Sequence, residues 1–213
     1  GGPLSWLDII GAPYAAEREA MAACNRAMGG GCSSIGEWHN SSMAIVRDRN
    51  GVLWNAWTGN GGAARKSLLA ECTAKQLVPT LQGLTQPVLG VCLGMQLMVE
   101  QSDEATTGTI DCLKLLPGHV KRMQAGELRL PHMGWNTISP VGDSPLFKGL
   151  GEGTYFYFVH SFAVPVYEHT LASCEYGQTF SAAIRHNNFF GVQFHPERSG
   201  EAGAQLLTNF VNL

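Results

Sequence analysis

The chain has 213 residues, of which 45% are hydrophobic and 15% are charged, and its formal net charge is -3. This length allows one domain, or two small ones, with a hydrophobic core that needs no disulfide or metal support. The weakly acidic charge argues against a nucleic-acid partner, and no apolar stretch reaches the roughly 18 residues of a membrane span. Since the first residues also lack the basic region of a signal peptide, we expect a cytoplasmic protein.

The first half of the chain alternates helical and extended patterns. Residues Pro13–Met28 have a helical composition that stops at a glycine run. Two β-prone runs then flank Asn50 and Gly51, a pair that is typical of hairpin turns. A second helical pattern follows over Ala63–Leu77. These segments predict a helix, a hairpin and another helix in that order.

The second half is richer in strands. Pro87–Val91 is a strand candidate and Gly94–Gln101 a helix candidate. TYFYFVHSF is typical of a strand with aromatic residues on both faces, and TLASCEY, TFSAAIRH and FFGVQF are further strand candidates. The last residues, SGEAGAQLLTNFVNL, carry apolar side chains at helical spacing. Mixed strands and helices without a long linker predict a single α/β domain over residues 1–213.

Cys92 lies at the end of the strand candidate, between Gly90 and Gly94. A strand, a tight turn and a helix with a nucleophile at the turn form a nucleophile elbow, in which flanking glycines avoid clashes between neighbouring atoms. The helix N-terminus favours a thiolate, and the backbone N–H of Leu93 is suited to stabilise an oxyanion. The pattern alone is equally compatible with a buried structural cysteine. The six cysteines include no C-x-x-C pair that would indicate zinc.

A thiol nucleophile needs a base, and one of the seven histidines has a carboxylate close by after a predicted strand. In GVQFHPERSG the strand delivers His195, Pro196 stiffens the turn, and Glu197 can accept a hydrogen bond from the imidazole. Alone, an H-P-E string is more typical of a solvated turn. Together with the elbow at Cys92, it predicts a Cys-His-Glu triad.

These strings resemble the class I glutamine amidotransferases of the triad type. LPHMGWNTI, GTYFYFVHSFAV and FFGVQFHPERSGEAGAQLLTNF are similar to the glutaminase subunit of imidazole glycerol phosphate synthase, and the resemblance runs from about Thr85 to Leu213. It implies a mostly parallel central sheet with helices on both faces. It also implies hydrolysis of glutamine to glutamate and ammonia, without a cofactor or metal. The ammonia would pass to a (β/α)8-barrel cyclase subunit in histidine biosynthesis.

The resemblance assigns roles to individual residues. Cys92 would be the nucleophile, His195 the general base and acid, and Glu197 the residue that orients His195. The positions implied to bind substrate are Leu93, Gln96, His160, Ser161 and Phe162, and those implied to face the cyclase are Met133, Trp135 and Asn136. Strand patterning alone would also accept Met133 and Trp135 as ordinary core residues.

Residues 1–84 fit the family pattern poorly. The family has a P-G-V-G string whose backbone supplies the second oxyanion N–H, and that string is absent here. The nearest counterpart is TGNGG, in which Gly59, Asn60 and Gly61 form a candidate oxyanion loop because glycine and asparagine tolerate positive φ. The same residues are equally compatible with a plain turn.

Two other functions stay open on the sequence. An amidotransferase component of another synthase, of the anthranilate or GMP type, would typically carry His after C-L-G and lack PHMGWN, whereas this chain has Met95. The other alternative is a catalytically impaired binding subunit, because the oxyanion loop departs from the family pattern. Release of glutamate from glutamine distinguishes that binding subunit from the enzymes.

Overall fold

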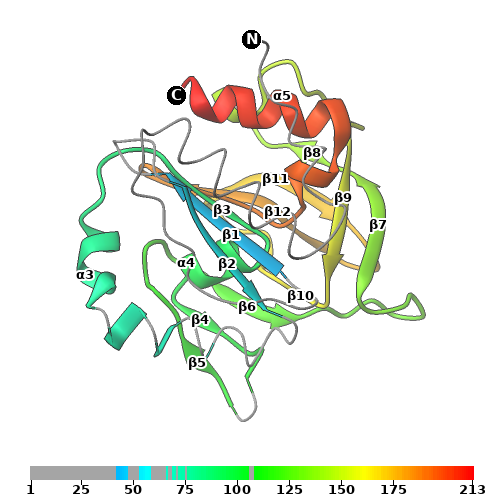
Figure 1. Ribbon diagram of the computed structural model, residues 1–213. Coiled ribbons are helices and arrows are strands. Elements are labelled where there is room, and N and C mark those ends of the chain that lie inside the picture. Colours follow the sequence, from blue (N-terminus) through cyan, green and yellow to red (C-terminus); the bar gives the residue numbers. More distant parts are fainter. Residues whose placement is uncertain are drawn as a thin grey trace, which may run out of the picture.

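The structure is a computed structural model that describes residues 42–47, 53–58, 66, 69–70, 72–74, 76–105 and 108–213 (Figure 1). The strands are β1 (Ser42–Arg47), β2 (Leu53–Thr58), β3 (Val88–Val91), β4 (Gln101–Ser102), β5 (Ile110–Asp111), β6 (His119–Arg122), β7 (His132–Thr137), β8 (Ser139–Pro140), β9 (Tyr155–His160), β10 (Phe162–Ala163), β11 (Thr170–Glu175), β12 (Thr179–His186) and β13 (Phe189–Val192). The helices are α3 (Leu77–Gln82), α4 (Leu93–Met98) and α5 (Gly200–Val211), and the 3-10 turns are η2 (Pro145–Phe147) and η3 (Pro196–Arg198). In this part of the chain, no helix is long and apolar enough to cross a membrane.

The hairpin expected around Asn50 and Gly51 is confirmed by its two strands. β1 and β2 pair antiparallel, with Arg47 opposite Leu53. The turn itself lies outside the described residues, as do the helix expected at Pro13–Met28 and the candidate oxyanion loop.

The central sheet has five strands in the order β3-β13-β12-β11-β8. β3 and β13 pair parallel, with Val91 opposite Val192, whereas the other pairings in this sheet are antiparallel. The α/β class is confirmed, but among the described strands this sheet is mixed rather than mostly parallel. The reason is local, because short turns join β11 to β12 and β12 to β13, and such turns produce antiparallel neighbours. β7 and β9 form a separate antiparallel ribbon.

Helices cover both faces of this sheet, as the resemblance implied. Alternate residues of a strand point to opposite faces, so Val88 packs with α4 whereas Leu89 packs with α5 (Figure 1). On the α5 side the core includes Phe156 and Phe194, whose rings stack with centroids 4.1 Å apart. Each fully buried side chain of this size contributes roughly 1.5–3 kcal/mol to the stability of the fold.

Two glycines allow α4 to lie directly against β3 and β13. A Cβ added to Gly90 would lie 2.7 Å from the backbone of Gly94 and Met95. A Cβ added to Gly191, which is opposite Gly90 in the register, would lie 2.7 Å from Cγ of Met95. The close packing of α4 therefore depends on the missing side chains, and it fixes the turn between β3 and α4.

Candidate active site

Cys92 occupies the turn between β3 and α4. β3 ends at Val91 and α4 begins at Leu93, so the cysteine is the single residue between them. Its backbone has φ 51° and ψ -107°, and its N–H donates to the carbonyl of Val192 at 2.7 Å. A residue with a Cβ pays about 1–3 kcal/mol for such a conformation. This is the strained strand-to-helix turn that the sequence predicts.

The parallel pairing of β3 and β13 brings the histidine to the same edge of the sheet. Since both strands run in one direction, Cys92 and the segment after Val192 leave the sheet side by side. The His195 N–H donates to the carbonyl of Tyr157 at 2.8 Å, and the hydroxyl of Ser199 donates to the His195 carbonyl at 2.6 Å. The backbone of His195 is thus held on both sides before its ring is considered.

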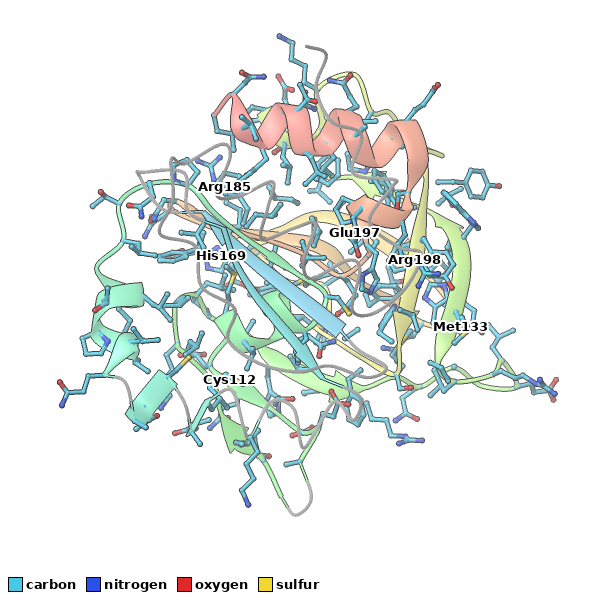
Figure 2. All side chains as sticks on the ribbon, viewed as in Figure 1. Cys112, Met133, His169, Arg185, Glu197 and Arg198 are labelled. Carbon is cyan, nitrogen blue, oxygen red and sulfur yellow. The ribbon has the colours of Figure 1, made fainter. Side chains whose placement is uncertain are left out.

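The imidazole of His195 pairs with Glu197 on the next turn. Nδ1 of His195 lies 2.7 Å from Oε1 of Glu197, and the imidazole is nearly fully buried. Figure 2 shows Glu197 and Arg198 on the turn that leads into α5. The other ring nitrogen, Nε2, is buried and has no hydrogen-bond partner of ordinary geometry in the described part of the chain. A nitrogen in this position is suited to exchange a proton with a group bound at Cys92.

Charge at this histidine is set by its neighbours. Burial acts to lower the pKa of His195, but the adjacent Cys92 sulfur and the Glu197 carboxylate outweigh burial and raise this pKa to about 10. A raised pKa means that the protein stabilises the imidazolium form. The arrangement therefore suits a positively charged imidazole beside the sulfur of Cys92.

Gln96 lies in the site, as the sequence predicts, but its amide contacts other protein groups. Its Nε2 donates to the carbonyl oxygen of Phe162 at 2.9 Å and to Oε1 of Gln193 at 2.9 Å. Gln193, which sequence reasoning missed, is fully buried, and its Nε2 lies 3.7 Å from Sγ of Cys92. The spacing in the sequence could have identified Gln193 as a site residue, because Gln193 and His195 are two residues apart on an extended segment and so face the same side.

The HSF segment contributes a buried imidazole and backbone carbonyls. The His160 side chain is buried, and its Nδ1–H donates to the carbonyl of Phe162 at 3.0 Å. Its Nε2 lies 3.1 Å from Nδ1 of His132. Burial lowers the pKa of His160 to about 3, so this ring is neutral at neutral pH. The carbonyl of Ser161 accepts the N–H of Met123 at 3.0 Å.

The residues expected to face the cyclase divide between the two faces of β7. The side chains of Met133 and Trp135 are 62% and 55% exposed, and Figure 2 shows Met133 at the outer side of the ribbon. Asn136 lies on the inner face, where its Nδ2 donates to the carbonyl of Glu175 at 2.9 Å. Beside the outer face, the guanidinium of Arg198 lies 4.3 Å from the ring centroid of Tyr157.

Comparisons with known proteins give the family of the chain. The family profile described as glutamine amidotransferase class-I matches residues 59–213. The chain is 52% identical over 165 residues to the imidazole glycerol phosphate synthase subunit HisH of Colwellia psychrerythraea, covering 72% of this chain and 73% of that protein. It is 54% identical over 180 residues to the subunit of the same name from Shewanella sediminis, covering 81% and 80%. A solved structure described as a glutamine amidotransferase shares the fold with a TM-score of 0.51 at 16% identity, covering 72% of this chain and 74% of that one.

Proposed function

This chain belongs to the class I glutamine amidotransferases, and we infer that it is the glutaminase subunit of an imidazole glycerol phosphate synthase. The observation that carries the inference is the meeting of Cys92, His195 and Glu197 at one edge of the sheet. We propose that these three residues form the catalytic triad. The named relatives supply the choice of synthase.

The first half of the reaction forms a thioester. The sulfur of Cys92 attacks the side-chain amide carbon of glutamine, and the carbonyl oxygen becomes an oxyanion. The Leu93 N–H, at the start of α4, is the proposed donor to that oxyanion. The C–N bond then breaks as His195 gives its proton to the leaving nitrogen. The products of this half are ammonia and a γ-glutamyl thioester on Cys92.

The second half returns the enzyme to its starting state. Neutral His195 takes a proton from water, and the water oxygen attacks the thioester carbon. The C–S bond breaks, which releases glutamate and restores the thiolate beside the imidazolium. Glu197 accepts the Nδ1–H of His195 throughout, so that Nε2 keeps facing the reacting atoms.

The ammonia needs an acceptor, and we propose a cyclase subunit docked on the outer face of β7 and β9. This face carries Met133, Trp135 and Tyr155 as large exposed side chains. Exposed aromatic and methionine side chains on one rigid ribbon are typical of the apolar centre of an interface. We place the pair in the cytoplasm, where a thiol such as Cys92 stays reduced.

The test compares two nitrogen sources in the assembled synthase. Cys92→Ala is expected to abolish glutamine-dependent synthesis and to leave ammonia-dependent synthesis intact, because the thiolate acts only on the amide. Cys174→Ala is the matched control, since Cys174 is a buried free thiol on β11. Equal loss with both nitrogen sources would show that Cys92 is structural. If the wild-type chain releases no glutamate even with its cyclase partner, the impaired-subunit alternative replaces the glutaminase.

A further inference from the structure

The side chain of Gln193 is a second polar group beside the sulfur of Cys92. It is fully buried, and its Nε2 lies 3.7 Å from Sγ, within the reach of an N–H···S hydrogen bond. Gln193 follows β13 directly and precedes His195 by two residues, so the amide and the imidazole approach the sulfur from the same segment. Which end of this amide faces the sulfur decides its chemistry, because an N–H stabilises a thiolate whereas an oxygen repels it.

A backbone carbonyl fixes the orientation of the amide. The carbonyl oxygen of Phe162 can only accept, so the atom of Gln96 that lies 2.9 Å away must be the donor Nε2. The same Nε2 lies 2.9 Å from Gln193, which must therefore present its acceptor, Oε1. It follows that the N–H groups of Gln193 point toward Cys92.

A second set of hydrogen bonds holds that carbonyl. Nδ1 of His160 donates to the Phe162 oxygen at 3.0 Å, which leaves Nε2 of His160 as an acceptor for Nδ1–H of His132 at 3.1 Å. Nε2 of His132 then accepts from Nδ2 of Asn136 at 3.2 Å. The same Nδ2 donates to the Glu175 carbonyl at 2.9 Å, which fixes the Asn136 amide independently. We call His160, His132 and Asn136 the neutral relay, since every bond in it requires an uncharged imidazole.

Packing keeps the neutral relay in place. The His132 ring is stacked between Tyr176 and Phe158, with ring centroids 3.9 Å and 4.9 Å away. Burial lowers the pKa of His132 to about 4, so this ring, like that of His160, is neutral at neutral pH. Rings held by stacking and by hydrogen bonds at both nitrogens have little freedom to turn. The relay therefore gives the Phe162 carbonyl, and through it Gln96, a fixed position.

We propose that Gln193 is a catalytic residue that donates its amide N–H to the Cys92 sulfur, and that Gln96 and His160 are positioning residues that hold this amide in orientation. The proposal rests on the glutaminase function proposed above. It adds to that function one residue that contacts the nucleophile and two residues that hold this residue in place. A hydrogen bond to an ionised sulfur stabilises the attacking thiolate and the thiolate that leaves at the end of the cycle. Gln193 acts on the nucleophile, so kcat is expected to depend on it more than KM for glutamine.

The direct test measures how fast iodoacetamide alkylates Cys92 in the full-length chain at neutral pH, followed by peptide mapping. Gln193→Met keeps the shape of the side chain and removes the donor. We expect alkylation to slow by roughly 10- to 100-fold, the range for a lost hydrogen bond to a charged group. Gln178→Met is the matched control, because Gln178 binds the backbone of Gln124 instead of the site. Alkylation of Gln193→Met at the wild-type rate would overturn the proposal.

Two variants of one histidine test the positioning residues. His160→Asn keeps a donor for the Phe162 carbonyl and loses the acceptor for His132, whereas His160→Gln keeps that acceptor and loses the donor. Each loses one buried hydrogen bond, so their stabilities are expected to fall alike. The alkylation rate is expected to fall further in His160→Gln than in His160→Asn. The opposite order, or equal rates, would refute positioning through the Phe162 carbonyl.

A measurement without substitution covers the case in which Gln193→Met does not fold. The side-chain N–H signals of Gln193 in the 15N-labelled wild-type chain are expected to shift when Cys92 is alkylated, and unchanged signals would refute the contact. None of these tests uses glutamine. A wild-type chain that alkylates readily but releases no glutamate with its cyclase partner would refute the glutaminase, while the alkylation rates would still decide the role of Gln193.

Discussion

Two buried histidines in one site differ in charge, because His195 favours the charged form and His160 the neutral form, and this contrast explains how the site works. The exposed fractions are 3% for His195 and 6% for His160, so burial is nearly the same. Burial lowers the pKa of His160 to about 3, whereas the pKa of His195, which burial would also lower, is raised to about 10 by Cys92 and Glu197. Burial alone always disfavours a charged ring, and a charged partner at hydrogen-bond distance reverses the outcome.

The partners of the two rings explain the difference. His195 pairs with a carboxylate at 2.7 Å and faces a sulfur that can ionise. His160 has a backbone carbonyl and a second imidazole, both neutral, at 3.0 Å and 3.1 Å. The first ring is suited to move protons and the second to hold a fixed hydrogen-bond direction. This division of labour can be broken by substitution at either ring.

The largest expected effect comes from removing the charged ring. His195→Asn eliminates the group that protonates the leaving nitrogen and activates water, so we expect kcat for glutamate release to fall by on the order of 10⁴ or more. His160→Asn is the companion variant, in which the charged ring remains and the loss is expected to be far smaller. Glutamate release is measured with the cyclase partner present. Comparable losses in the two variants would erase the distinction between the rings.

The next effect comes from neutralising the partner of the charged ring. Glu197→Gln keeps the shape of the side chain but removes the charge that stabilises the imidazolium. We expect kcat to fall on the order of 10- to 10⁴-fold, by analogy with other catalytic triads. Glu175→Gln, a change of the same kind on β11, serves as the control because its side chain binds Thr179 outside the site. Unchanged kinetics in Glu197→Gln would remove Glu197 from the triad.

The two rings should also give opposite dependence of stability on pH. The folded pKa of His195 is raised to about 10, so its stabilising contribution is complete below its unfolded value near 6.5 and is lost as pH rises toward 10. The folded pKa of His160 is lowered to about 3, so its contribution is complete above about 6.5 and is lost as pH falls toward 3. Each histidine adds a slope of at most about 1.4 kcal/mol per pH unit.

Urea unfolding at a series of pH values measures the free energy of unfolding as a function of pH, with an acid limb below neutral pH and an alkaline limb above it. His195→Asn is expected to flatten the alkaline limb of the free energy of unfolding, and His160→Asn the acid limb. If His160→Asn leaves the acid limb unchanged, this ring is not neutral in the folded state. A pH profile that keeps its alkaline limb in His195→Asn would assign that limb to another group.

The smallest effect on the isolated chain is expected from the outer face of β7, directly across the strand from the neutral relay. Trp135→Glu should weaken stimulation by the cyclase subunit while leaving the alkylation rate of Cys92 near wild type, because the Trp135 side chain is exposed on the outer face of β7. Val166→Glu introduces the same charge at a large exposed residue outside this ribbon and should preserve stimulation. Full stimulation of Trp135→Glu would move the docking surface elsewhere.

Local patterns in the sequence predicted much of this structure. The run Pro87–Val91 contains β3, TYFYFVHSF contains β9, and the final helical pattern contains α5. The aromatics of β9 alternate as expected, with Phe156 and Phe158 fully buried and Tyr155 exposed. The glycines around Cys92 predicted the nucleophile elbow, and the H-P-E string predicted the His195–Glu197 pair. Both features depend on residues that are close together in the chain.

Features that depend on distant pairing could not be predicted. The order of the strands, and with it the mixed direction of the central sheet, is set by which segments meet in space. The neutral relay joins Asn136 and His132 on β7 to His160 on β9, and no spacing within either strand indicates that contact. Gln193 was visible as a neighbour of His195, but its importance appears only once Gln96 and Cys92 lie beside it.

The backbone conformation at Cys92 lowers the stability of the fold, although the reaction needs a side chain at this position. Glycine adopts the backbone conformation at φ 51° and ψ -107° without steric cost, whereas any residue with a Cβ is strained there. Cys92→Gly should therefore unfold at a higher temperature than Cys92→Ala, although neither has a nucleophile, and comparing the two isolates the strain of the backbone. Selection for heat resistance alone would favour losing the side chain that serves as the nucleophile.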